Sequence, residues 1–270
     1  MTDDESGLLR VMTLNLHVDW PGSPRPWRGR RPLVAELLRA ARPHLLGTQE
    51  GLREPLRELA DDLGRERYAW VGQGREGGES GEFMAVGYDR ERFEALEHGD
   101  FWLSDTPEVP GSETWGGGCP RMVTWLRLRD LVTGTELLAA NTHFDHASAH
   151  ARTRAAHLLA DRLHTLAPGL PRIVTGDFNT AAGSDVHAAL LGAADLVDTW
   201  EVAERRGPAL GTFHDYGTPE PDGERIDWIL VSPGTRVREV VLDEFTRDGL
   251  RPTDHLPVRA EIQVPRTPAR

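Results

Sequence analysis

Residues 172–179 read RIVTGDFN, an apolar run that ends in two polar residues, Asp177 and Asn179. Its composition and length predict a buried strand with the polar pair at the carboxyl end. A helical pattern over 148–166, with Ser148 as a candidate N-cap, separates this run from the strand pattern TELLAANTHF at 135–144. Strands that alternate with helices predict an α/β fold, in which sites lie at strand ends.

The N-terminal part of the chain follows the same order of strand, helix and strand. Residues 8–16 (LLRVMTLNL) predict a buried strand, and a helix is expected over 32–42, with Pro32 at its start and Pro43 closing it. The strand HLLGTQE then ends at Glu50. A second helix is indicated by leucines at near-helical spacing, at Leu52, Leu56, Leu59 and Leu63.

Most of the remaining segments are predicted to be β. Strands are expected in YAWVG, EFMAVGY, ERFEALEHGDFWLS, RIDWILVS, RVREVVLD and HLPVRAEIQV, with a hairpin around LVTG at 131–134 and a short helix at 184–191. This order predicts two stacked sheets with helices outside. We expect one domain over 1–270, with loose tails at 1–7 and 265–270.

The composition excludes several classes of protein. The 270 residues are 39% hydrophobic and 27% charged, and no apolar run approaches the ~20 residues of a membrane span, which predicts a soluble globular protein. The acidic N-terminus lacks the features of a secretory signal, so a cytoplasmic location is expected. Cys119 is the only cysteine and all 31 basic residues are arginine, which excludes intrachain disulfides, multi-cysteine zinc sites and lysine-dependent chemistry.

Polar residues able to bind a metal or a phosphate recur at the ends of the predicted strands. They are Asn15, Glu50, His143, Asp177 with Asn179, and Asp254 with His255. Any one of them alone is more often a turn or cap residue. As a set at strand ends, they predict a functional site.

These motifs resemble, in chain order, the endonuclease/exonuclease/phosphatase superfamily. The resemblance covers about residues 8–264 and rests on LNL with Asn15, TQE with Glu50, NTHFDH with His143, GDFN with Asp177 and Asn179, RIDWILVS with Asp227, and TDHLPV with Asp254 and His255. The segment FWLSDTPEVPGSETW further resembles a bacterial branch of metal-dependent hydrolases. The resemblance implies a four-layer α/β sandwich of two packed mixed sheets flanked by helices, with the site in a cleft at one edge.

The resemblance also implies hydrolysis of phosphate esters with Mg²⁺ or Mn²⁺. Glu50 is the expected principal ligand, with Asn15 and Asp254 beside it, because Mg²⁺ prefers hard oxygen ligands. Whether one ion or two bind is left open. Asp177 is expected to orient or deprotonate the attacking water, and Asn179 to place that water or hold the phosphate.

Two histidines complete the catalytic set that the resemblance implies. Asp227 is expected to accept a proton from one nitrogen of His255, which favours the cation and directs the other nitrogen at a phosphate oxygen. Either Asp177 or His255 could be the base. His143 is a second donor to the phosphate, with Glu82 as its candidate partner.

Arg121 and Trp115 are candidate substrate-binding residues. The planar guanidinium of Arg121 suits a substrate phosphate, and an exposed strand-edge arginine is an equal alternative. The loop 104–120 is expected to form one wall of the cleft. Trp115 would contact the organic part of the substrate or, with equal weight, pack the loop down.

A zinc site is another interpretation of His143, Asp145, His146 and His150. The stretch THFDH half-resembles the THxHxDH signature of metallo-β-lactamase-fold hydrolases but lacks its second histidine, because residue 144 is Phe. Surface or capping roles for His146 and His150 are favoured over zinc.

The expected substrate is a small soluble phosphomonoester or phosphodiester, attacked in line by an activated water. The formal charge of -12 disfavours DNA or RNA without excluding it, so an endo- or exonuclease is the first alternative. A phospholipid-headgroup phosphodiesterase is less favoured, since no apolar hairpin or amphipathic basic helix is evident. A non-catalytic binding module would be expected to have lost one of the central residues, all of which are present. The sequence does not indicate an oligomeric state.

Overall fold

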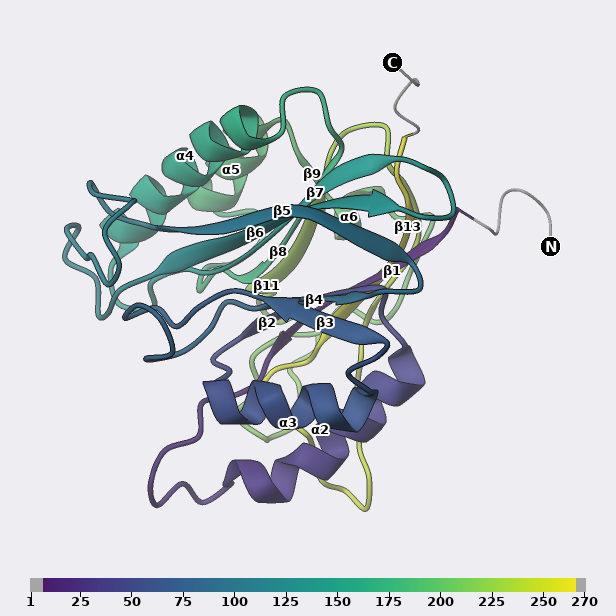
Figure 1. Cartoon of the computed structure of the whole chain (residues 1–270). Coiled ribbons are helices and arrows are strands. Elements are labelled where there is room, and N and C mark those ends of the chain that lie inside the picture. The colour runs from purple at the N-terminus through teal and green to yellow at the C-terminus, as the bar shows by residue number, and fades with distance from the viewer. Residues whose placement is uncertain (1–6, 266–270) are drawn as a thin grey trace.

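The structure is a computed structural model that describes residues 7–265. Two mixed sheets pack face to face with helices on their outer sides (Figure 1), which confirms the predicted α/β sandwich. The expected loose tails fall mainly on residues 1–6 and 266–270, outside the described residues, whereas Gly7 is buried. Among the helices of the described chain, none combines the length and apolar character that a bilayer crossing requires.

The first sheet has seven strands. Their order across the sheet is β10 (Arg205–Arg206), β12 (Arg236–Leu242), β13 (Val258–Gln263), β1 (Leu9–Asn15), β2 (Leu45–Gln49), β4 (Val86–Asp89) and β3 (Tyr68–Val71). Strands β1 and β2 run parallel, with Asn15 opposite Gln49. This register places Asn15 beside the residue that follows β2, which is Glu50.

The second sheet has six strands. Their order is β5 (Phe93–Trp102), β6 (Met122–Asp130), β7 (Glu136–His143), β8 (Arg172–Asp177), β11 (Asp227–Val231) and β9 (Val197–Asp198). The parallel pair β7 and β8 sets His143 opposite Asp177, and the antiparallel pair β8 and β11 sets Asp227 opposite Asp177. Three of the expected site residues therefore share one end of this sheet.

Helices cover the outer face of each sheet. Helices α2 (Trp27–Ala41) and α3 (Arg53–Leu63) pack on the first sheet through leucines of α2 and α3 and apolar residues of β1 and β2. Helices α4 (Ala149–Leu166) and α5 (Asp185–Ala194) cover the second sheet, and the short α6 (Thr199–Val202) follows β9. The Ser148 hydroxyl accepts from the Ala151 N–H at 3.2 Å, so the predicted N-cap is confirmed.

Helix α2 begins five residues earlier than expected. It starts at Trp27, so Pro32 lies inside the helix rather than at its start. The Trp27 N–H donates to Asp19 Oδ1 at 2.8 Å, and the buried Trp27 indole donates to Glu58 Oε2 at 2.7 Å. These tertiary contacts stabilise an extra first turn, which local proline preferences do not predict.

Candidate active site

Asn15 joins the two sheets at the centre of the site. This fully buried residue ends β1, and its Nδ2 donates to Glu50 Oε1 at 2.8 Å and to Asp177 Oδ2 at 3.0 Å. The Glu50 Oε2 accepts from the Val18 N–H at 2.8 Å. Glu50 and Asn179 both have left-handed backbone, with φ of 60° and 49°. Non-glycine residues in this conformation cluster at functional sites, where surrounding structure holds them in place.

The donor set around Asn15 fits a hard divalent cation. Ligand atoms of Glu50, His143 and Asp177 all lie within 4.8 Å of one another. Because Asn15 Nδ2 donates to both Glu50 and Asp177, the two carboxylates are held close together, and a bound cation would offset their mutual repulsion. Glu50 is the residue best placed to be the principal ligand of such a cation.

Asp254, the other predicted ligand, is held by its neighbours in the described chain. Its Oδ2 lies 2.5 Å from His17 Nδ1, and its Oδ1 accepts from the Thr253 hydroxyl at 3.1 Å. Burial raises the pKa of Asp254, but the His17 hydrogen bond and the charge of His255 outweigh burial and lower it. The single proton of the Thr253 hydroxyl is shared with the Asn15 carbonyl at 2.7 Å, so Asp254 is tied to the site. Its role as a ligand stays a prediction.

Asp177 is a buried carboxylate whose pKa is suited to proton transfer. Its exposed fraction is 1%, and its Oδ1 accepts from the Asn179 N–H at 3.0 Å. Burial, and then the like charge of Asp227, raise the pKa of Asp177 to about 7, against the opposing effect of His255. A carboxylate in this range can both accept a proton and release it near neutrality.

His255 is held as a cation by the carboxylates around it. Its Nδ1 lies 2.9 Å from Asp227 Oδ2, and its Nε2 lies 3.8 Å from Asp177 Oδ2. Burial lowers the pKa of His255, but the charge and hydrogen bond of Asp227, followed by the charges of Asp177 and Asp254, raise it to about 10. The structure therefore brings Asp227 and His255 together as the resemblance implied.

His143 and Asn179 lie on the same side of Asp177. His143 Nε2 is 2.9 Å from Asn179 Nδ2 and 3.5 Å from Asp177 Oδ2. Asn179 Nδ2 also donates to the Phe144 carbonyl at 3.0 Å, which fixes this nitrogen as the donor. His143 Nε2 is then the acceptor and Nδ1 carries the proton, and this buried Nδ1 has no partner within the described residues.

The expected pairing of Glu82 with His143 does not occur within residues 7–265. Glu82 Oε2 accepts instead from Arg75 Nη1 at 2.7 Å. The cause is the tight turn after β3, in which the Arg75 N–H also donates to the Glu82 carbonyl at 2.9 Å. This turn brings the arginine back onto the carboxylate.

A buried polar cluster links the two sheets next to the site. Asn141 Oδ1 accepts from Gln49 Nε2 at 2.7 Å and from the Thr175 hydroxyl at 3.1 Å, and its Nδ2 donates to the Thr48 and Ala85 carbonyls at 2.8 and 3.0 Å. A Cβ at Gly47 would meet Thr175 Oγ1 at 2.1 Å, so only glycine fits there. These contacts set the spacing between sheets that Asn15 and Asp177 require.

Arg121 is buried rather than an exposed strand-edge residue. Its exposed fraction is 5%, Nη2 lies 3.0 Å from His146 Nδ1, and Nε lies 3.8 Å from Asp145 Oδ2. The charge of Arg121, after burial, contributes to lowering the pKa of His143 well below its usual value. Arg121 Nη1 has no partner within the described chain, which leaves a cationic donor for an anion.

Trp115 packs beneath the loop that carries it. It is 8% exposed, it joins the apolar cluster under α4, and the Arg154 guanidinium lies 5.0 Å from the centre of its ring. These contacts match the packing alternative. Contact with a substrate stays a prediction.

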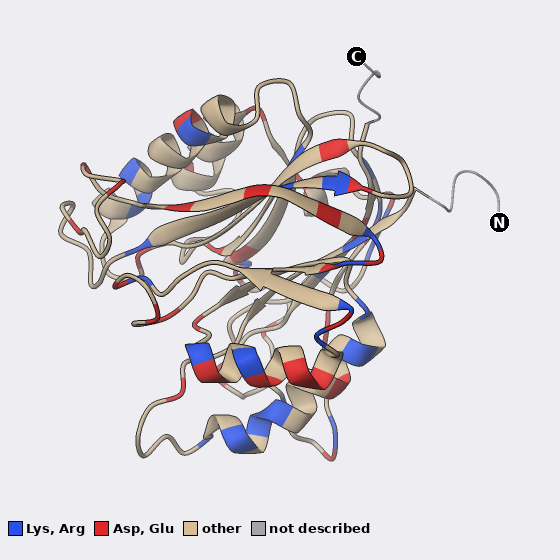
Figure 2. Cartoon of the chain, in the orientation of Figure 1, with Lys and Arg blue, Asp and Glu red and all other residues tan. Residues whose placement is uncertain are grey.

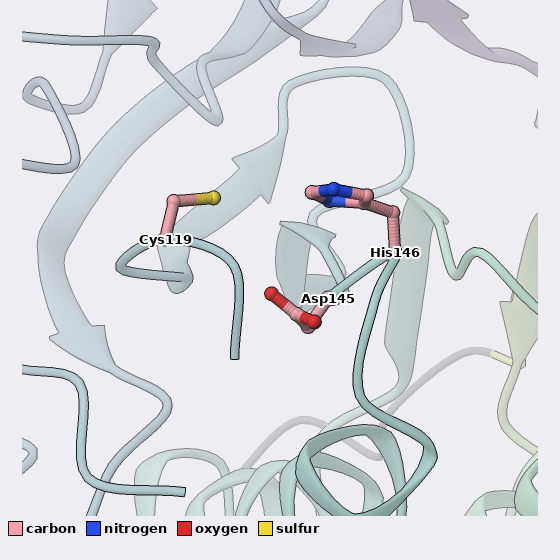
Figure 3. A group of neighbouring side chains, drawn as sticks. All are labelled: Cys119, Asp145 and His146. Carbon is pink, nitrogen blue, oxygen red and sulfur yellow. The ribbon is translucent and has the colours of Figure 1, made fainter. Parts of the chain in front are cut away.

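The residues of the zinc alternative are used for other contacts. Figure 3 shows the Cys119 thiol and the His146 ring extending toward the same space, with Asp145 beside them. Asp145 Oδ1 accepts from the Ala147 and Ser148 N–H groups at 2.9 and 2.7 Å, and its Oδ2 accepts from the Gly118 N–H at 2.8 Å. His146 Nδ1 faces the Arg121 guanidinium and His150 is exposed. Capping and loop attachment therefore account for this group.

Several residues near the site were not singled out from the sequence. His17 contacts Asp254, Phe213 lies beside His255, and Gln49 and Asn141 join the sheets. His17 lies only two residues after Asn15, which was a usable signal. Gln49 and Asn141 lie inside the quoted motifs TQE and NTHFDH, which was the same kind of signal, whereas Phe213 meets His255 only through a contact between distant segments.

Comparison with known proteins agrees with this fold. The model of the Endonuclease/Exonuclease/phosphatase family matches residues 12–255. A protein of that family from Bacteroides thetaiotaomicron is 31% identical, with a TM-score of 0.88 and 94% of each chain covered. The Bacteroides thetaiotaomicron mannosyl-6-phosphatase Bt3783 is 32% identical, with a TM-score of 0.86, over 94% of this chain and 99% of that one.

More distant structures share the fold alone. The human Nocturnin catalytic domain is 20% identical, with a TM-score of 0.71, over 95% of this chain and 94% of that one. A search among curated proteins returned no match. The family model and the two structures above 30% identity show that this chain belongs to the Endonuclease/Exonuclease/phosphatase family, whose members are phosphoesterase hydrolases.

Proposed function

We propose that this enzyme is a Mg²⁺- or Mn²⁺-dependent phosphomonoesterase that acts on a small sugar phosphate. The observation that carries the proposal is the group of Asn15, Glu50 and Asp177, which holds two carboxylates close together beside a cationic His255. The 32% identical mannosyl-6-phosphatase supports a sugar monoester over a diester.

The residues of the site have two tasks, to activate the attacking water and to bind the phosphate oxygens. Asp177 orients the attacking water and takes its proton, which its pKa of about 7 allows. His255, Arg121 and His143 would supply donors for the phosphate oxygens, and Asn179 would place the water or the phosphate. A monoester dianion needs more cationic donors than a diester, and His255 and Arg121 are the two cationic side chains that would serve.

Glu50 would hold the metal ion, with Asn15 and Asp254 beside it. When bound, the ion polarises a phosphoryl oxygen and offsets charge on the leaving oxygen. Asn15 fixes the positions of Glu50 and Asp177 relative to each other, because its amide nitrogen donates a hydrogen bond to each carboxylate.

A nuclease is the second candidate. The net charge of -12 opposes binding to a polyanion. Figure 2 shows acidic and basic residues interspersed along α3 and over the visible strands, with no continuous basic stripe across this view of residues 7–265. Both features favour a small ester over a nucleic acid polymer.

The test is a panel assay of the purified protein with Mg²⁺ and Mn²⁺, alongside Asp177→Asn. We expect release of phosphate from hexose phosphates, at a rate that falls about 10²–10⁴-fold in the variant because water activation is lost. Diesters, phospholipids and single-stranded DNA are the other substrates in the panel. Cleavage of DNA that weakens steeply between about 50 and 200 mM salt, without turnover of any monoester, would reverse the order of the two candidates.

A further inference from the structure

Two exposed aromatic rings contact the histidines of the site. Trp20 is 44% exposed and Phe213 is 52% exposed, although large aromatic side chains are usually buried. The Trp20 ring centroid lies 5.0 Å from that of His17, and the Phe213 centroid lies 5.1 Å from that of His255. Other large apolar side chains that are exposed in the described chain are aliphatic: Val109, Leu131, Val132, Val202 and Leu250. We refer to Trp20 and Phe213 as the aromatic rim.

The aromatic rim is attached to the catalytic residues by backbone and side-chain contacts. Phe213 pairs with His255 in an isolated β-bridge, and the His214 N–H donates to the Asp254 carbonyl at 2.9 Å. His17 lies under Trp20 and reaches Asp254 through its Nδ1. Both rings of the rim therefore adjoin histidines that meet at the segment Asp254–His255.

The two loops that carry the rim are also joined to each other. The ring of Tyr216 contacts His17, with centroids 5.4 Å apart, and the Arg25 guanidinium lies 4.2 Å from the centre of the Tyr216 ring. These contacts link residues 17–25 to residues 213–216. A preformed surface of this kind lowers the entropic cost of binding a ligand.

An exposed carboxylate next to the rim in the chain offers an acceptor for the hydroxyl groups of a substrate. Asp215, which lies two residues after Phe213, is exposed and makes no hydrogen bond or ion pair within the described residues. Carboxylates accept from hydroxyl groups and repel further phosphates. Aromatic faces are electronegative and attract the polarised C–H groups of a sugar ring.

We propose that the aromatic rim binds the sugar ring of the leaving group, and that Phe213 and Trp20 select hexose phosphates over acyclic phosphate esters. This inference rests on the proposed function and adds the part of the substrate that the catalytic residues do not contact. The phosphate is held at Asp177 and His255, while the ring lies against Phe213 and Trp20.

The experiment compares mannose 6-phosphate with glycerol 3-phosphate, whose organic part is acyclic. Phe213→Ala and Trp20→Ala should each raise KM for mannose 6-phosphate about three- to tenfold, with kcat changed little. The KM for glycerol 3-phosphate and the inhibition constant of inorganic phosphate should stay within about twofold, because the phosphate contacts remain. Phe213→Tyr should retain the wild-type KM, since it keeps the aromatic face.

Leu131→Ala is the matched control, because Leu131 is an exposed apolar residue in the turn between β6 and β7. This variant should change the KM for neither substrate. Wild-type protein that hydrolyses no hexose phosphate would overturn the proposed function together with this inference. Hydrolysis of mannose 6-phosphate that the two alanine variants leave unchanged, or that falls equally with glycerol 3-phosphate, would overturn the inference alone. If the alanine variants raise the KM for nucleoside monophosphates more than the KM for hexose phosphates, the aromatic rim binds a nucleobase instead of a sugar.

Discussion

Asp227 Oδ2 lies 2.9 Å from His255 Nδ1, and both residues are buried where β11 and the segment before β13 meet. The carboxylate holds the ring nitrogen that faces it and stabilises the imidazolium, so the other nitrogen, Nε2, is directed toward Asp177, 3.8 Å away. Removal of either residue should therefore have similar consequences.

Asp227→Asn and His255→Ala should each lower kcat about 10²–10⁴-fold while the protein stays folded. In the double variant kcat should fall little further, because the two residues act as one unit. Steady-state kinetics of the three variants, with circular dichroism as the folding control, test this. A double-variant loss equal to the product of the single losses would show that the residues act independently.

Removal of the metal should abolish activity. Exhaustive EDTA treatment should leave no turnover, and Mg²⁺ or Mn²⁺ should restore it, because the predicted ligands, Glu50, Asn15 and Asp254, offer hard oxygens. Glu50→Gln should raise the metal concentration needed for half-maximal activity more than about tenfold, because a charged ligand is lost.

Cys119→Ser and His146→Ala are the controls for this metal titration. Neither residue contacts Glu50, so the metal requirement should match that of the wild type. Full activity after EDTA would contradict metal dependence. Restoration by Zn²⁺ alone, and its loss in His146→Ala, would support a zinc site.

The link between the sheets should be required for activity as well as for stability. Asn141→Leu keeps the branching of the side chain, removes four hydrogen bonds and leaves Gln49 Nε2 with one partner fewer. The free energy of unfolding should fall by about 2–4 kcal/mol, and kcat should fall below the value expected from the folded fraction. Thr175→Val removes fewer of these contacts and should lower the free energy of unfolding by about 1 kcal/mol. Urea unfolding and assays at low temperature separate the two effects, and an unchanged kcat in Asn141→Leu would limit the cluster to a structural role.

Stability should decrease in mild acid because of His44. Burial, followed by the charges of Arg10 and Arg92, lowers the pKa of His44 to about 4, and Arg10 donors lie 3.2 and 2.7 Å from its two ring nitrogens. The folded-state pKa is below the unfolded value of about 6.5, so the stabilisation is present above pH 6.5 and is lost as the pH falls toward 4. The contribution is on the order of 2–3 kcal/mol.

Urea unfolding at about pH 7.5 and about pH 5 measures this contribution. His44→Gln should show a smaller difference between the two pH values than the wild type does. The exposed His157 provides the control, and His157→Gln should keep the wild-type difference. An unchanged pH dependence in His44→Gln would assign the acid sensitivity to other groups.

Much of the sandwich and the identity of the polar site residues follow from local sequence patterns. The apolar strands with polar ends, the Ser148 cap and the leucine spacing in α3 are local features, and local preferences and periodicity specify them. Hence Asn15, Glu50, Asp177 and His255 could be selected before their positions in space were known.

Only the tertiary structure decided which of these residues meet and what they contact. The pairing of Glu82 with Arg75, the burial of Arg121 and Trp115, and the early start of α2 depend on contacts that local preferences do not encode. The pKa of about 7 at Asp177 likewise exists only where burial and Asp227 act on it together. Desolvation and charge interactions act through space, whereas sequence patterns report neighbours along the chain.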